Sequence, residues 1–110
     1  MQDMKISELQ KLIQIIGNPV SGEIHNGEEI RIIILQRGWV IIGRFFQNGT
    51  RCWISKGFVI RQWGTTHGLG ELAINGPQQE TVLDEIPETI FHELTIVASI
   101  ICDKSKWNNL

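Results

Sequence analysis

The sequence has few of the features that mark secreted, disulfide-rich or membrane-spanning proteins. It contains two cysteines, Cys52 and Cys102, too few for a disulfide framework. The opening residues, MQDMKISELQ, show neither the basic start nor the apolar segment of a secretory signal. No apolar run reaches the roughly 18–20 residues that cross a bilayer. We therefore expect a cytoplasmic protein with two reduced thiols and no membrane span.

The chain also lacks the residue spacings of metal sites and catalytic motifs. Its histidines, His25, His67 and His92, stand apart from one another and from both cysteines, so no zinc-binding spacing exists. A pairing in space stays open, and His67 is the best candidate base, because the glycine-rich loop around it is expected to be exposed. We predict no catalytic residue, no metal site and no cofactor.

Charges of one sign are missing from two long stretches. Residues 30–63 contain six basic and no acidic side chains, and residues 64–102 contain six acidic and no basic ones. Such blocks indicate an anionic partner or self-complementary contacts between copies, or else two surfaces that cancel within one fold. The net charge of −2 by itself implies no partner.

Length and apolar periodicity predict one domain that begins with a helix. A chain of 110 residues, 42% of them hydrophobic, can build one core and not two. In residues 4–16, apolar side chains recur every three or four positions, and Gly17 and Pro19 end this pattern. We therefore expect a single domain, residues 1–110, with an N-terminal helix.

Tight turns predict an antiparallel meander in the middle of the chain. Asn48-Gly49 is the strongest hairpin signal, because both central positions of a type I′ turn need a positive φ. Lys56-Gly57 turns the chain again. These signals predict four short strands, at residues 30–36, 39–46, 51–55 and 58–63.

The last third of the chain predicts a short helix, a loop and a strand. We expect a helix of one or two turns at residues 69–74, an acidic loop at 77–88, and a final strand at 94–102. This strand is apolar on both faces and is therefore expected to be buried or central. The expected fold class is α+β: an N-terminal helix followed by a small bent antiparallel five-stranded sheet or barrel, with a short helix before the last strand. Barrel closure would also remove exposed edges.

Arginine and tryptophan alternate at two places in the predicted meander. Arg51 and Trp53 share one face of a strand, and Arg61 and Trp63 share a face of the next, because residues two apart point the same way. If the register aligns the pairs, the indoles stack on a base and the guanidiniums bind phosphate. The alternative is that the tryptophans pack at a barrel end or a subunit interface, covered by the arginine stems.

The segment after Trp63 adds small residues to this candidate site. The run Gly68-Leu69-Gly70-Glu71-Leu72-Ala73 fits G-x-G-x-x-A, but the βαβ context of a dinucleotide fold is missing. Backbone amides at Gly70 remain candidates for holding an anion, and the alternative is a turn with a helix cap. The predicted ligand-binding residues are Arg51, Trp53, Arg61, Trp63, Thr65, His67 and Gly70.

Three segments carry a resemblance to a known group of proteins. These are VIIGR at residues 40–44, WGTTHGLGELAING at residues 63–76, and ASIIC at residues 98–102. Over residues 30–102 the chain resembles a family of short, uncharacterised bacteriophage proteins. The resemblance implies a phage origin and therefore a place in the host cytoplasm, and it implies no particular activity.

These observations lead to three hypotheses about function. The first is a non-enzymatic phage accessory protein that binds a nucleotide-like anion or a host protein, as a counter-defence inhibitor or sponge. The second is a small barrel that binds DNA or RNA, with strong salt dependence. The third is a small-nucleotide hydrolase that uses His67. The charge blocks and the surplus of apolar surface also lead us to expect a homo-oligomer.

Overall fold

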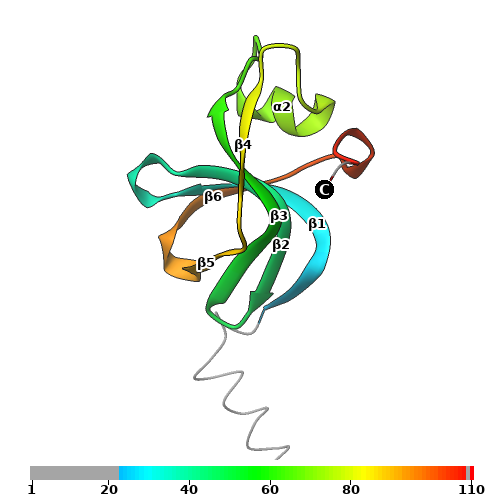
Figure 1. Ribbon diagram of the computed structural model, residues 1–110. Helices are drawn as coiled ribbons and strands as arrows, with labels where there is room; N and C mark the ends of the chain where they lie inside the picture. The colour runs from blue at the N-terminus through cyan, green and yellow to red at the C-terminus, as the bar shows by residue number, and fades with distance from the viewer. Residues whose placement is uncertain (1–22, 109) are drawn as a thin grey trace, which may run out of the picture.

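The computed structural model describes residues 23–108 and 110, and these form one antiparallel sheet with a short helix (Figure 1). The helix α2 spans Leu69–Asn75, and single 3-10 turns lie at Gln36–Gly38, Glu93–Thr95 and Lys104–Lys106. The six strands are β1 (Ile24–Leu35), β2 (Val40–Asn48), β3 (Arg51–Gln62), β4 (Val82–Ile86), β5 (Thr89–His92) and β6 (Ile96–Ile101). No helix in the described part of the chain is long and apolar enough to cross a membrane.

The sheet is open, with the strand order β4-β3-β2-β1-β6. The strands β4 and β5 share one edge of β3: β5 pairs with its first residues, Arg51 to Ile54, and β4 with its second half, Gly57 to Gln62. Among the described residues, β6 pairs with β1 alone. The α2 helix lies at one end of the sheet, and the β2–β3 hairpin lies at the other (Figure 1).

The expected fold class is wrong, because the protein is mostly sheet. The sheet has six strands rather than five, and it does not close into a barrel. The predicted helix at residues 4–16 lies outside the described residues. The helix predicted at residues 69–74 and the strand predicted at residues 94–102 are both present, as α2 and β6. However, β6 is an edge strand and not a central one.

The predicted turn at Lys56-Gly57 is a bulge within one long strand. Lys56 has a φ of 54°, and the pairing of β3 with β2 shifts register there and then continues. A side chain at Gly57 would lie 2.5 Å from Ile54 and 2.9 Å from the carbonyl oxygen of Ile42, so only glycine fits at the crowded bend. The two strands predicted on either side are therefore the single strand β3.

The acidic segment predicted as a loop contains β4. Its carboxylates Asp84 and Glu85 are exposed, whereas Leu83 and Ile86 are half-buried against the core. Acidic side chains are tolerated here because β4 is an edge strand, and charge at an edge protects it from unwanted pairing. The acidic charge of this segment therefore led to the prediction of a loop, because the strand has few buried apolar side chains.

Two apolar clusters cover the two faces of the sheet. On β1, the neighbours Ile32 and Ile33 are both fully buried and belong to different clusters, because successive residues of a strand point to opposite faces. This explains the isoleucine run in β1. The first cluster includes α2 and the C-terminal residues Trp107 and Leu110. The second contains Ile41, Phe45, Cys52 and Ile54 besides Ile33.

Candidate binding groove

The four arginine and tryptophan residues of the predicted patch do not come together. Because β3 is one strand, Arg51 and Trp53 lie at its start, and Arg61 and Trp63 lie at and just beyond its end. Ten residues of strand at about 3.3 Å each separate the pairs by roughly 30 Å along the chain, before the bend is counted. The cross-strand patch is therefore wrong, because it depended on a turn at Lys56-Gly57.

The first pair is packed against the sheet. The Trp53 ring stacks on Phe46 of the neighbouring strand, with centroids 5.3 Å apart and an interplanar angle of 6°. The Arg51 guanidinium lies 5.4 Å from the centroid of the Trp53 ring. A side chain at Gly27, which has a φ of +86°, would lie 2.3 Å from the Phe46 ring. At this end of β3 the tryptophan therefore packs against the sheet, which is the alternative given in the sequence analysis.

The second pair, Arg61 and Trp63, forms hydrogen bonds with an acidic residue and a loop residue. The Nη1 atom of Arg61 donates to Asp84 Oδ2 of β4 at 2.8 Å, so the basic and acidic blocks meet within one chain here. Trp63 is 43% exposed, and its carbonyl oxygen accepts a hydrogen bond from the Thr81 hydroxyl at 2.7 Å. The positive charge of Arg61 is thus already partly neutralised at an exposed surface.

The loop of residues 64–70 makes its own hydrogen bonds. The Thr65 hydroxyl donates to the carbonyl oxygen of Gly68 and accepts from its amide, at 2.7 and 3.1 Å. The His67 amide donates to Glu71 Oε1 at 2.7 Å, and Gly70 is exposed in the first turn of α2. A carboxylate of α2 itself therefore binds a backbone amide just before the helix, in the manner of a capping box.

Neither cysteine is available as a nucleophile at neutral pH. Cys52 is fully buried, and burial with the nearby Glu93 carboxylate raises its pKa to about 11. Burial also raises the pKa of Cys102 to about 12. Because the thiolate is the reactive form, both residues act as small buried apolar side chains. No cluster of three metal-ligating side chains occurs in residues 23–108 and 110.

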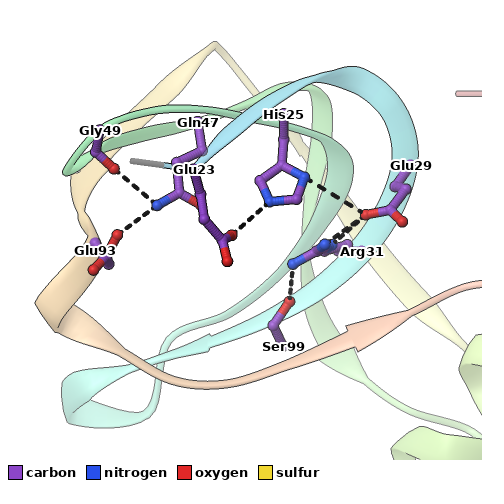
Figure 2. A network of polar contacts seen from close by, with 8 residues as sticks. All are labelled: Glu23, His25, Glu29, Arg31, Gln47, Gly49, Glu93 and Ser99. Atoms are coloured by element: carbon purple, nitrogen blue, oxygen red, sulfur yellow. Dashed lines mark hydrogen bonds and ion pairs between the residues drawn. The ribbon is translucent and has the colours of Figure 1, made fainter. Parts of the chain in front are cut away.

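A polar network that sequence reasoning missed lies beside the second cluster (Figure 2). His25 Nε2 and Glu23 Oε1 are 2.9 Å apart, Arg31 pairs with Glu29, and Arg31 Nη1 donates to Ser99 Oγ at 3.1 Å. The side chain of Gln47, 5% exposed, donates to the carbonyl oxygen of Gly49 at 2.9 Å and to Glu93. These groups satisfy one another, so the network stabilises the sheet.

The described residues form a concave, largely apolar groove of about 520 Å³. One side is the end of β1 with the turn that follows it, and the other side is the segment from the end of β4 to β5. Two of its large apolar side chains are strongly exposed: Trp39 at 57% and Ile90 at 54%. We call it the Trp39 groove; its lining residues are Leu35, Gln36, Arg37, Trp39, Ile41, Ile86, Pro87, Thr89, Ile90, Phe91 and Thr95.

The backbone of the turn between β1 and β2 places arginine and tryptophan together at this groove. Arg37 and Gly38 both have positive φ, 69° and 84°, and the Leu35 amide donates to the carbonyl oxygen of Trp39 at 2.8 Å. Among the described residues that line the groove, Arg37 carries the one charged side chain. Sequence reasoning assigned Trp39 to a strand and missed the groove, because the loop was expected at residues 77–88 and residues 89–91 were assigned to no element.

Comparison with known proteins assigns no family to this chain. The chain matches no protein-family model, and no curated protein matches it.

Proposed function

We propose that this protein is a non-enzymatic binding protein that takes an apolar segment of a partner protein into the Trp39 groove. The observation that carries the proposal is the exposure of Trp39 and Ile90 at the rim of a largely apolar concave surface. Exposed aromatic and aliphatic side chains in a concave surface are typical of binding sites, since burying them on contact releases water.

The electrostatics of the groove favour a mostly apolar ligand. Within the described residues, Arg37 is the one charged group of the lining, and Gln36, Thr89 and Thr95 supply the polar side chains. A single guanidinium suits one carboxylate at the end of an apolar segment, with a bidentate contact. We therefore infer a ligand segment with two or three apolar side chains and an adjacent acidic residue.

A nucleotide-like ligand is the second candidate, and one observation favours it. Arg37 and Trp39 lie two residues apart and line the same groove. This is the combination of charge and stacking that the sequence analysis sought at Arg51 and Trp53, and here the indole is exposed rather than packed. The shortage of further donors for phosphate places this candidate second.

Binding to DNA or RNA has less support in the distribution of basic side chains. Arg31 is paired with Glu29, and Arg61 is paired with Asp84. Arg44 donates to the carbonyl oxygens of Gly27 and Leu110, at 3.0 and 2.7 Å. A phosphate-binding surface needs several unengaged cations on one side, and three of the six basic residues of the block are held within the fold.

The biological setting of the proposal comes from the resemblance to bacteriophage proteins. In that setting the protein acts in the host cytoplasm as an accessory protein, and the ligand segment belongs to a host protein. An inhibitor or sponge of a host defence component fits a small binding protein of this kind. A hydrolase that uses His67 has less support, because His67 is exposed on a loop and does not line the Trp39 groove.

Selection from a random peptide library displayed on phage tests the proposed function. We expect enriched peptides to be apolar with an acidic residue, and to bind the wild-type protein and the Ile74→Glu variant equally. Ile74 on α2 is 61% exposed and outside the groove, so this variant is a matched control for Ile90→Glu, at which affinity falls by about tenfold or more.

Titration with nucleotides separates the two candidate ligands. Titration with ATP and with a cyclic dinucleotide, followed by NMR, gives shift changes at Trp39 that disappear in Arg37→Ala if the second candidate is right. Enriched peptides that bind Ile90→Glu as tightly as the wild type would place the binding surface elsewhere and contradict the proposal.

A further inference from the structure

The two faces of the sheet are covered unequally by the described residues. The first cluster is covered by α2 and by the C-terminal residues Trp107 and Leu110. Over the second cluster the described residues form the Trp39 groove, whose lining includes Ile41 of that cluster and Phe91 packed against it. An apolar sheet face is stabilised when another element packs on it. The second face can therefore accept one more covering element.

Residues 4–16 have the sequence pattern of such an element. They lie outside the described residues, and their sequence predicts an amphipathic helix. At about 100° per residue, its apolar stripe consists of Ile6, Leu9, Leu12, Ile13 and Ile16. Glu8 borders this stripe, because it precedes Leu12 by one helical turn, and the long stem of Lys5 can carry its amine to solvent. The segment thus combines apolar side chains with an adjacent carboxylate, the composition inferred above for a ligand of the groove.

The length of the chain allows this segment to reach the groove of its own molecule. The described part begins beside the β2–β3 hairpin, where the Gly49 amide donates to the carbonyl oxygen of Glu23 at 3.1 Å. The 12 residues of β1 lead from there to the groove, which is at most about 40 Å, and the strand is strongly curved (Figure 1). Residues 17–22 in extended form span roughly 20 Å, and a helix over residues 4–16 adds about 20 Å. No second copy is needed to bring the segment to the groove.

We propose that residues 4–16 pack their apolar stripe into the Trp39 groove of the same chain, with Glu8 beside Arg37. This inference rests on the proposed function, because it names the occupant that a partner segment displaces. The contact covers Trp39 and Ile90, and the Glu8 carboxylate pairs with the one charged side chain of the described lining. A tethered segment has an effective concentration on the order of millimolar, so even a weak contact keeps the groove occupied. Residues 4–16 are therefore an intramolecular inhibitor of partner binding.

A spin label on the segment tests the contact in the full chain. Gln10→Cys places the label on the polar side of the predicted helix, and both native cysteines are buried, with a raised pKa, so the new thiol is the reactive one. We expect the label to broaden the NMR signals of the Trp39 indole and of the Ile90 methyl groups. The broadening should disappear when Leu9→Glu and Leu12→Glu are added, because two charges then interrupt the apolar stripe.

The matched control is the pair Ser7→Glu and Gln14→Glu, which adds the same two charges on the polar side and should keep the broadening. A mixture of spin-labelled chain and isotope-enriched, unlabelled chain shows whether the contact is intramolecular, in which case the enriched chain is not broadened. Broadening in the mixture would mean that the segment is exchanged between copies. That result would overturn the intramolecular contact and would give the homo-oligomer expected from the sequence.

Peptide affinity tests the inhibition separately. A peptide selected from the library should bind the Leu9→Glu, Leu12→Glu variant about tenfold more tightly than the wild type, because the tethered competitor is removed. The Ser7→Glu, Gln14→Glu control should bind it like the wild type. Absence of broadening at Trp39 overturns the inference, and so does equal peptide affinity in the two glutamate variants. Failure to select any peptide would instead count against the proposed function, while the spin label still decides on the intramolecular contact.

Discussion

The segments Arg51–Trp53 and Arg61–Trp63 share one local pattern, an arginine two residues before a tryptophan, at opposite ends of β3. At the hairpin end, Trp53 is half-buried on Phe46, and Arg51 covers its ring. At the α2 end, Trp63 is exposed and Arg61 pairs with Asp84. The neighbours differ because β5 pairs with the first end and β4 with the second. Identical local chemistry thus becomes packing at one end and a solvated ion pair at the other.

The largest single effects should come from glycines at the two ends. Gly64→Ala should lower the free energy of unfolding by about 3 kcal/mol, because φ is +70° and the new carbon would lie 2.3 Å from the backbone of Glu80. Gly27→Ala should cost about 2 kcal/mol, since the Phe46 ring that it meets can rotate away. Urea unfolding measures both values.

Gly38→Ala is the control for these glycines. Gly38 has a φ of +84° and no atom within 4 Å of the added carbon, so its replacement should cost about 1 kcal/mol of backbone strain alone. An equal loss of unfolding free energy in Gly64→Ala and Gly38→Ala would show that the backbone near Glu80 moves easily. The expected difference between crowded and uncrowded glycines would then be wrong.

The tryptophans themselves should differ next. Trp53→Ala should cost about 2–3 kcal/mol of unfolding free energy, because it removes a half-buried ring stacked on Phe46. Trp63→Ala should cost less, about 1–2 kcal/mol, because the ring is 43% exposed. Chemical denaturation of both variants checks this order, and the reverse order would mean that the α2 end is the better packed one.

The two buried thiols should make the free energy of unfolding depend on pH. Cys52 has a pKa of about 11 and Cys102 of about 12, both above the ordinary 9.0 of an unfolded thiol. Each thiol's contribution to stability is complete below its pKa in the unfolded state. This contribution is lost as the pH rises toward its pKa in the folded state. Between pH 9 and 10, each thiol should account for about 1 kcal/mol of lost unfolding free energy.

Cys52→Ala and Cys102→Ala supply the matching controls for the pH series. Each variant should lose less stability over this interval than the wild type, because one titrating thiol is absent and the lysines are unchanged. Urea unfolding at each pH measures the difference. Identical slopes in the wild type and a variant would show that the thiol in question ionises as readily folded as unfolded.

The arginines should show the smallest effects. Arg61→Ala should cost less than about 1 kcal/mol, and high salt should abolish this cost, because the pair with Asp84 is exposed. Arg51→Ala should cost a similar amount that persists in salt, since its stem lies against the Trp53 ring. Melting temperatures at low and high salt distinguish the two, and equal salt dependence would contradict the assignment of Arg51 to packing.

Several local elements were predictable because their signals are local. The hairpin between β2 and β3 lies where Asn48-Gly49 predicts it. Its loop residues are Gly49 and Thr50, however, and of Asn48 and Gly49 only Gly49 has a positive φ, 68°, so the turn is not the expected type I′ turn. The glycine after α2 ends the helix, and Gly76 has a φ of 82° there. Lys56-Gly57 carries a similar turn signal and forms a bulge, because β2 continues to pair with β3 on both sides of it. Whether a positive φ turns the chain or bends a strand depends on that partner strand.

The candidate site was less predictable than the fold. The sequence identified arginine and tryptophan alternation as chemically useful, but it could not show that Arg51 and Arg61 occupy one strand. The Trp39 groove joins residues 35–41 with residues 86–95, and no local pattern connects segments so far apart. Exposed Trp39 and Ile90 stand out only when burial is known.

By itself, the sequence determined the elements whose cause is short-range: the hairpin at Gly49, the isoleucine-rich second half of β1, the helix α2 and the apolar strand β6. Backbone sterics and alternating side-chain direction act over a few residues, so they can be read directly. Only the tertiary structure decided that β3 is continuous, that the sheet is open, and that β6 lies at its edge. Those features follow from which strands pair, and pairing is a balance of burial and hydrogen bonding among residues distant in the chain.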